Sequence, residues 1–509
     1  MAKNSYLLVF LVVVALTFLT RIGVNRQEVY ATSAAHVGSM QFPSGFYWGG
    51  AISAQQAESQ QPTDWTDFEL DAFKSGRFDT GPSPGVAKAG HIHDLGKSSA
   101  KVRLEKTGFE RSYPQDLAMA KAMGMNAFRF SIDLARLFPR PNMAQPDPAG
   151  IAFYKSMLAE MKRDGITPFA TMFHFASPSW FFDPDAQGRR GWERADALQN
   201  WQQFATTVAE SFVPDIVQWC TVNESLVYVY NGYLEGVFPP FERRRDVTNA
   251  AGVVESLLRA HVIAYQALHS TAERKSVKVN VWFTKHTRAF EPLRNWSPLD
   301  RLTAQSVDQA WNWDFIDAVE SGRLKLLNTN IDKPIEGLKG TQDYIGINYY
   351  GRFYIKSDIF NVTKPQVLLH DPDANGEPVN DLGWALYPHG FYEVLTKAAR
   401  RYHKPIYVLE NGTADKADND VERQKFLVSH VRELWLAINQ SQADVRSYIH
   451  WSLFDNFEWA EGFTARFGLV AVDYAKDFQR TPRPSAEVFA EIANANALSE
   501  KLIKRLGGP

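Results

Sequence analysis

Two glutamates stand at the ends of strongly apolar segments and are the first candidates for chemistry. Glu224 closes the segment IVQWCTVNE that starts at residue 216, and Glu410 lies in PIYVLENG from residue 405. A structural salt bridge would explain either carboxylate alone, because a buried carboxylate without a partner is costly. A pair has a chemical use. Two carboxyl groups about 5 to 5.5 Å apart can break a glycosidic bond with retention, since one attacks the anomeric carbon and the other protonates the leaving oxygen.

The segments that carry these glutamates belong to a regular alternation of short apolar runs and longer amphipathic runs. From about residue 41 onward, this alternation is typical of a parallel sheet whose strands are joined by helices. Eight strand-like segments are present, beginning at residues 46, 126, 167, 216, 277, 343, 405 and 446. Eight strands close a TIM barrel. We therefore predict an α/β fold, a single (β/α)8 TIM barrel with long loops over the active site.

The amphipathic segments between the strands are predicted to be the covering helices. Between residues 151 and 165, apolar residues from Ile151 to Met161 recur on one helical face, and Gly165 marks the end of the helix. Further helices are predicted from residues 195, 250 and 389. Each of these helices is long enough to cover one strand of the barrel.

The chain shows no linker that would separate two halves, so one domain is predicted for residues 41–495. Residues 1–40 precede it as a hydrophobic segment and linker, and residues 496–509 follow it as a tail. Two long polar segments, 69–110 and 351–383, come after barrel strands. We expect both to form loops at the mouth of the barrel, where such folds carry specificity.

The barrel would bring the two glutamates together. The carboxyl ends of all its strands face one pocket, so polar residues at these ends are candidates for chemistry rather than for packing. Glu224 ends the fourth predicted strand and Glu410 ends the seventh. These strands lie across the barrel from each other, and we expect the two side chains to flank one sugar ring.

Composition excludes several other classes of function. The net charge of −2 provides no basic surface for nucleic acid. The single cysteine, Cys220, excludes an internal disulfide framework and lies in an apolar run, where it is expected to be an inert core thiol. No cluster of histidine and acidic residues has the spacing of metal ligands, so neither a metal nor another cofactor is expected.

An apolar stretch from Tyr6 to Leu19, preceded by Lys3 and followed by Arg21, predicts targeting to the secretory pathway. The stretch is short for a spanning helix and matches the hydrophobic part of a signal peptide. The nearest small-residue cleavage pattern, at residues 31–36, lies unusually far downstream. Secretion after cleavage and membrane association through residues 6–19 therefore both remain open.

A series of motifs resembles glycoside hydrolase family 1, the β-glucosidase family, across nearly all of residues 41–490. The series includes FPSGFYWGGAISAQQAE from 42, FRFSIDLARLFPR from 128, TMFHF from 171, TVNE from 221, DYIGINYY from 343, GWALYPHG from 383, YVLENG from 407 and WSLFDNFEWAEGFTARFGLVAVDY from 451. The last two motifs are highly specific. The resemblance implies a β-glycosidase that acts through a covalent glycosyl-enzyme.

The same resemblance implies a role for individual residues. Glu224 would be the acid/base and Glu410 the nucleophile, which Arg129 and Tyr350 would keep ionised. The implied substrate-binding residues are Gln56, Arg129, His174, Asn223, Asn348, Tyr350, Trp451, Glu458 and Trp459. Among them, the two tryptophans would form platforms for the sugar ring.

The chain departs from the family pattern at several positions. Ser225 stands where the family usually has proline after the acid/base, which leaves the leaving-group specificity in doubt. Phe175 and Leu134 each replace a tryptophan that is common in the family. Glu224 argues against thioglucosidase activity, because that branch has glutamine at this position.

Three functions remain open from the sequence. We expect an exo-acting β-glycosidase that removes glucose or galactose from a small-molecule or glycolipid β-glycoside. Some features resemble archaeal β-glycosidases and also the plant galactolipid galactosyltransferases of the family, so a retaining transglycosylase is an alternative. A catalytically silent sugar-binding relative is a second alternative, although such relatives commonly lose one of the two carboxylates.

Overall fold

The computed structural model describes most of the chain. It covers residues 38–77, 91–92, 99–326, 329–358, 365–372 and 377–507. The apolar stretch of residues 6–19 lies outside the described residues. Within these ranges, no helix combines the length and the hydropathy that a membrane span needs.

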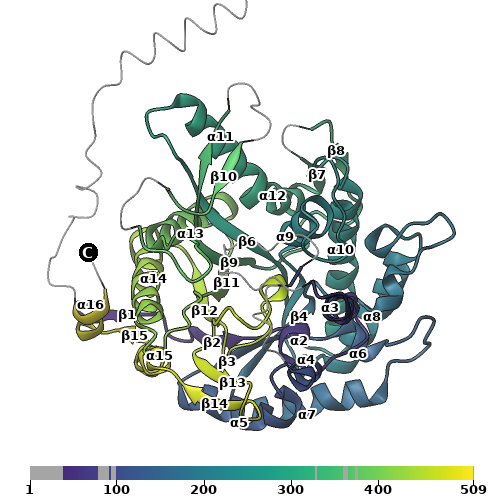
Figure 1. The fold of residues 1–509 in the computed structure, drawn as a ribbon, viewed down its shortest axis with the longest axis horizontal. Helices are drawn as coiled ribbons and strands as arrows, with labels where there is room; N and C mark the ends of the chain where they lie inside the picture. The colour runs from purple at the N-terminus through teal and green to yellow at the C-terminus, as the bar shows by residue number, and fades with distance from the viewer. Residues whose placement is uncertain are drawn as a thin grey trace, which may run out of the picture.

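Eight parallel strands form a closed barrel, which confirms the predicted TIM-barrel fold (Figure 1). The strands are β2 (Tyr47–Ala51), β3 (Ala127–Ser131), β4 (Thr167–Phe173), β5 (Gln218–Asn223), β6 (Asn280–Pro292), β9 (Ile345–Lys356), β11 (Ile406–Asn411) and β12 (Val445–Trp451). They pair in this order, and β9 pairs with β6 to complete the circle. Seven of these strands begin within a predicted segment, and β12 begins one residue before the segment predicted from residue 446.

Helices surround the barrel and cover the outer faces of its strands (Figure 1). The larger ones are α3 (Asp64–Ser75), α5 (Phe109–Ala122), α7 (Pro148–Asp164), α8 (Ala197–Phe212), α10 (Ala251–Arg274), α11 (Pro298–Asp308), α12 (Asp314–Ser321), α13 (Pro388–Tyr402), α14 (Val421–Gln440) and α15 (Pro484–Ala495). The helix predicted between residues 151 and 165 is α7. It begins where the side chain of Asp147 accepts a hydrogen bond from the Ala149 amide, and it ends at Gly165, whose φ of 71° suits glycine.

Shorter elements complete the fold. They are the helices α2 (Ala54–Ala57), α4 (Ala100–Glu105), α6 (Leu134–Leu137), α9 (Ser225–Val229) and α16 (Glu500–Leu506), and the strands β1 (Met40–Gln41), β7 (Arg323–Lys325), β8 (Asp332–Pro334), β10 (Gln366–Leu368), β13 (Val470–Asp473), β14 (Gln479–Pro482) and β15 (Ala497–Leu498). Single turns of 3₁₀-helix lie at Ser179–Phe182, Gly191–Glu193 and Trp459–Glu461, and π-helical turns lie at Tyr230–Leu234 and Gln309–Trp313.

Strand alternation divides the apolar residues into two buried clusters. On β11, Ile406 and Val408 belong to the cluster between strands and helices, whereas Tyr407 and Leu409 belong to the cluster inside the barrel. Cys220 also lies in the inner cluster, as expected for a core thiol, and burial raises its pKa. The inner cluster therefore forms a packed floor below the carboxyl ends of the strands.

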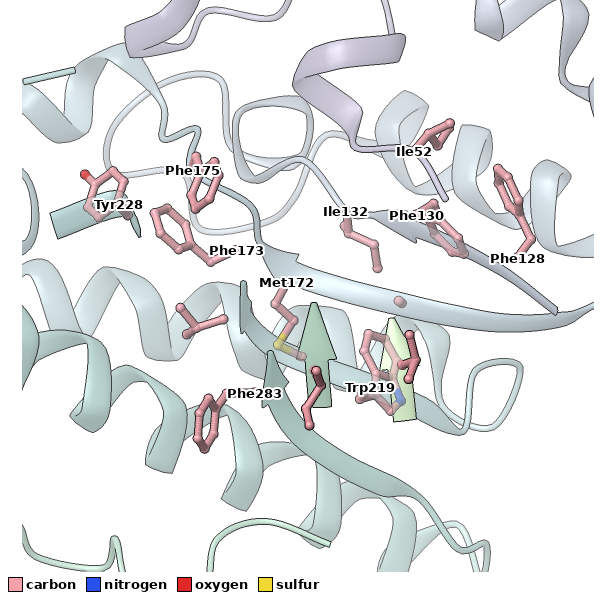
Figure 2. Packing of buried hydrophobic residues seen from close by; sticks show 14 of the residues in the cluster. Ile52, Phe128, Phe130, Ile132, Met172, Phe173, Phe175, Trp219, Tyr228 and Phe283 are labelled. Carbon is pink, nitrogen blue, oxygen red and sulfur yellow. The ribbon is translucent and has the colours of Figure 1, made fainter. Parts of the chain in front are cut away.

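The outer cluster packs the strands against the covering helices, as Figure 2 shows for part of it. Phe128 and Phe130 alternate with interior residues along β3, and both are buried. Phe173 at the end of β4 meets Tyr228 of α9 edge to face, with 5.2 Å between their ring centroids. This packing fixes the ends of β4 and α9, both of which adjoin the cavity described below.

The two polar segments contain more regular structure than the sequence suggests. In the first, α3 ends at Ser75, α4 spans residues 100–105, and α5 begins at Phe109. In the second, β9 continues to Lys356, and β10 pairs with it in antiparallel orientation. The expectation of loops was therefore wrong for these parts.

The end of the chain also differs from the tail that we expected at residues 496–509. Strand β15 pairs with β1, and α16 buries Leu502 completely. Residues as far as Leu506 are thus packed onto the barrel, because Leu498 and Leu502 supply apolar anchors.

Candidate active site

Glu410 lies inside the barrel because β11 departs from regular alternation. Leu409 already faces the interior, so a regular strand would turn Glu410 outward. The pairing of β11 with β9 shifts its register between Val408 and Glu410. Such an irregularity redirects a side chain, and here it directs the buried carboxylate toward the centre of the barrel.

Two neighbours hold the Glu410 carboxylate from different sides. The Arg129 guanidinium, from β3, forms an ion pair with Oε1 through Nη1. The Tyr350 hydroxyl, from β9, donates a hydrogen bond to Oε2 at 2.6 Å. Arg129 and Tyr350 thus both contact Glu410, so the carboxylate has a cation and a hydroxyl donor.

Glu224 immediately follows β5 and has an unusual backbone conformation. Its φ of 47° and ψ of 53° lie in the left-handed region, which costs a non-glycine residue about 1–3 kcal/mol. Asn348 Nδ2 of β9 donates a hydrogen bond to Glu224 Oε1 at 2.6 Å. The conformation and this contact together hold the carboxyl group in the cavity.

The electrostatic setting of Glu224 favours its protonated form. Burial raises the pKa of its carboxyl group to about 8, and the charge of Glu410 contributes in the same direction. The hydrogen bond from Asn348 and the charges of Lys285 and Arg129 oppose this rise but do not cancel it. An effect of this kind on Glu224 is expected where two carboxyl groups line one cavity.

Asn223 and His174 extend the contacts of Arg129 to the wall of the cavity. Arg129 Nη2 donates to Asn223 Oδ1 at 2.7 Å, and Asn223 Nδ2 lies 3.2 Å from His174 Nε2. Burial, with the neighbouring Arg129, holds the pKa of His174 well below its usual range, so the ring is neutral. His174 Nδ1 is buried without a partner, which leaves this atom free to bind a ligand.

A cavity of about 470 Å³ lies at the carboxyl ends of the strands. Its size suits a small ligand, and most of its wall is apolar or aromatic. Eight of the predicted residues line it, namely His174, Asn223, Glu224, Tyr350, Glu410, Trp451, Glu458 and Trp459. The structure thus brings both glutamates and both tryptophans to one cavity.

Three predicted residues lie behind the wall rather than in it. Arg129 contacts Glu410, and Asn348 contacts Glu224, so each acts through a glutamate. Gln56 is fully buried and donates from Nε2 to Glu458 Oε2 at 3.2 Å. Burial raises the pKa of Glu458 to about 8, with a further contribution from Glu410. The contact of Gln56 with the sugar therefore stays a prediction.

The arrangement offers two unlike carboxyl groups facing one cavity. One forms an ion pair with a cation and accepts a hydrogen bond from a hydroxyl, and the other is biased toward a carboxylic acid. This asymmetry supplies a nucleophile and a proton donor at the same time. Substitution at an acetal carbon with retention requires that combination.

Comparison with known sequences identifies the family. The sequence model of glycosyl hydrolase family 1 matches residues 38–498. The chain belongs to glycosyl hydrolase family 1. It is accordingly an O-glycosyl hydrolase that acts with retention, and the resemblance seen in its motifs is confirmed.

Relatives of known function and structure within family 1 agree over almost the whole chain. A beta-galactosidase of Saccharolobus solfataricus is 29% identical over 91% of this chain and 96% of its own length. Beta-glucosidase A of Thermotoga maritima is 27% identical over 90% of this chain and 99% of its own length. The solved structure of a beta-glycosidase from Pyrococcus horikoshii has a TM-score of 0.78 and 33% identity, covering 92% of this chain and 99% of that one.

The cavity of this family 1 enzyme also contains residues that the sequence analysis missed. His286 and Arg288 of β6 line it, and Lys285 lies buried beside Glu224. Burial lowers the pKa of Lys285 to about 7, although the charge of Glu224 opposes this, and Lys285 Nζ donates to the His286 carbonyl at 2.7 Å. The spacing of two between His286 and Arg288 was the available signal, because alternate residues of a strand share one face.

No metal centre accompanies these residues in the part of the chain that the structure describes. There, no group of three or more histidine, cysteine, aspartate and glutamate side chains could hold a metal ion. Arg129, Lys285 and Arg288 are buried cations at or beside the cavity.

Proposed function

We propose that this enzyme removes a terminal β-linked glucose or galactose from a small-molecule or glycolipid β-glycoside. The observation that carries the proposal is the unlike pair of carboxyl groups in one cavity, one of them with a pKa raised to about 8. The relatives named beta-galactosidase and beta-glucosidase support both sugars. The same relatives do not favour either alternative, a retaining transglycosylase or a catalytically silent sugar-binding protein.

In the proposed first step, a Glu410 oxygen forms a bond to the anomeric carbon while the bond from that carbon to the leaving oxygen breaks. Glu224 gives its proton to the leaving oxygen, so the leaving group departs as an alcohol. In the second step, Glu224 takes a proton from water as the water attacks the anomeric carbon. The bond from the anomeric carbon to Glu410 breaks as this new bond forms, so Glu410 regains its carboxylate and the sugar leaves with its original configuration.

The sugar itself would be held by the polar residues of the cavity. His174 has the buried, unpartnered Nδ1 that could bind a hydroxyl, and Glu458, oriented by Gln56, could accept from two neighbouring hydroxyls. Asn223 lies beside Glu224 and could reach the 2-hydroxyl. Trp451 and Trp459 would stack against the apolar face of the ring.

A direct assay tests the proposal. Purified protein should hydrolyse nitrophenyl β-glucoside, nitrophenyl β-galactoside or both, and NMR should show the β-anomer as the first product. The corresponding α-glycosides serve as controls and should not be cleaved. A protein that turned over no β-glycoside, or that released the α-anomer first, would contradict the proposed function.

The raised pKa of Glu224 predicts the alkaline side of the pH profile. The first step needs protonated Glu224, so the reactive form is fully present well below pH 8 and is lost as pH rises through about 8. We expect kcat/KM to fall by about tenfold per pH unit above that point. Initial rates with a nitrophenyl glycoside between pH 5 and pH 10 would show this. A fall in kcat/KM that began about two pH units lower would contradict the assignment of Glu224 as the group that must be protonated.

We also propose that residues 6–19 direct the chain into the secretory pathway, as a secreted or membrane-anchored protein. The proposal rests on the length and composition of the apolar stretch and on the basic residues that flank it.

A further inference from the structure

Arg288 is a buried cation in the cavity that the proposed mechanism does not use. Its side chain comes from β6 and lines the cavity, although the residue is only 2% exposed. Within the described ranges it forms no salt bridge, and its Nε and Nη1 atoms are buried without a hydrogen-bond acceptor. A guanidinium in this state lacks the partner that buried charges normally have.

Two aromatic rings fix the position of this guanidinium. Arg288 Cζ lies 4.3 Å from the centroid of the Phe353 ring and 4.6 Å from that of the Trp384 ring. Contacts with the faces of these rings offset part of the cost of burying the charge. An aromatic ring, however, is not a hydrogen-bond acceptor of normal strength for the N–H groups of the guanidinium. Although burial lowers the pKa of Arg288 to about 10, the group is still charged at neutral pH.

The place of Arg288 in the barrel assigns it to the leaving-group side. In the circular order of strands, β6 lies opposite β2, and Gln56 and Glu458, which would hold the sugar, belong to the segments after β2 and β12. The proposed proton donor, Glu224, follows β5, the neighbour of β6. The leaving oxygen must therefore point toward the side from which Arg288 projects.

The cavity that Arg288 lines has a largely apolar wall, although His286 and Tyr350 also line it. Val367 and Leu369, from β10 and the residue after it, line the cavity together with Leu382 and the two aromatic rings. A ligand that suits this surface has an apolar body and one group with several acceptor oxygens. The planar fork of a guanidinium binds carboxylate, sulfate or phosphate oxygens in pairs.

We propose that Arg288 binds an oxyanion carried by an apolar leaving group, so that the preferred substrates are β-glycosides of anionic aglycones. This inference rests on the proposed glycosidase function and adds the substrate class. Arg288 would act as a specificity residue, with its unsatisfied N–H groups completed by the substrate.

Two matched substrates test the inference. One is the β-glycoside of 4-hydroxybenzoic acid, and the other is the β-glycoside of the corresponding neutral amide. Both carry the same sugar, which is whichever of glucose and galactose the enzyme removes faster. The measured quantity is the ratio of kcat/KM for the acid to kcat/KM for the amide. We expect R288M to lower this ratio by at least about tenfold, the scale of one lost charge-assisted hydrogen bond. R288K should retain part of the preference, because it keeps the charge and loses the fork.

The matched control is R243M. Arg243 also lines the cavity but is exposed, so its removal should change the ratio less than about threefold. Equal effects of R243M and R288M would indicate a general electrostatic field and would overturn the inference. A ratio unchanged in R288M would also overturn it. A β-glycoside with a 4-sulfophenyl aglycone can replace the carboxylic acid in this ratio, which tests a second oxyanion.

A binding measurement separates this inference from the proposed function. Calorimetry with the 1-thio-β-glycoside of 4-mercaptobenzoic acid reports binding without turnover, and R288M should weaken binding by at least about tenfold. If the wild-type enzyme cleaved neither substrate, the proposed function would be contradicted and this measurement would still test Arg288. Equal affinities for wild type and R288M would then count against the role of Arg288.

Discussion

The variant Glu410→Gln is expected to lower kcat on every cleaved β-glycoside by at least about 10⁴-fold. Glutamine keeps the size of the side chain and can still accept a hydrogen bond from Tyr350, but it lacks the charge that pairs with Arg129. An amide oxygen is a poor nucleophile, and no other carboxylate is ion-paired in this way beside Glu224 in the described part of the cavity. Steady-state kinetics with nitrophenyl glycosides measures the loss.

A second variant shows whether such a loss is specific. Glu461 also lines the cavity, so Glu461→Gln removes one acidic charge without touching the proposed mechanism, and it should change kcat by less than about tenfold. Circular dichroism and thermal melting of both variants would exclude unfolding as the cause. If Glu410→Gln retained more than about one tenth of the wild-type rate, Glu410 could not be the nucleophile.

The variant Glu224→Gln is expected to affect substrates unequally. A nitrophenyl glycoside whose leaving group needs little protonation should still form the glycosyl-enzyme, whereas a glycoside with an alkyl leaving group should react about 10²–10⁴-fold more slowly. Hydrolysis of the intermediate also slows, because water loses the base that Glu224 supplies in the second step. A glycosyl-enzyme should therefore accumulate, with a burst of released nitrophenol.

An external nucleophile that needs no base should restore turnover in this variant. Azide is such an anion, and it should release the trapped sugar as a β-glycosyl azide. The measurement is the rate of nitrophenol release with and without azide, together with the anomeric configuration of the product. Equal losses on both kinds of substrate, with no effect of azide, would make Glu224 a structural residue instead of the acid/base.

The sequence was sufficient for the framework of the site. Periodicity located all eight barrel strands, and their apolar character explains why residues such as Glu224 and Glu410 stood out at the ends. The family motifs then placed the tryptophans and His174, which do meet at one cavity. Local pattern determines the strands and the resemblance to the family supplies the binding residues, so no knowledge of distant contacts was needed.

The remaining features depend on contacts between segments that are distant in the sequence. The register shift that directs Glu410 inward arises from its pairing with β9, and local periodicity would place it outward. Arg288 was missed because the apolar run that begins at residue 277 ends before it, whereas pairing with β9 extends β6 to Pro292. The hydrogen bond from Gln56 to Glu458 likewise joins two segments about 400 residues apart, and the contact of Gln56 with the sugar stays a prediction.

The most direct test of the account is to trap the covalent intermediate. A 2-deoxy-2-fluoro β-glycoside with a good leaving group slows both steps, and the second step becomes slow enough for the sugar to remain attached. Mass spectrometry of the digested protein should find the fluorosugar as an ester on the peptide that contains Glu410, and Glu410→Gln should not be labelled. A fluorosugar attached to Glu224 or Glu458 would contradict the double-displacement mechanism. So would the absence of any attached fluorosugar from an enzyme that the compound inhibits.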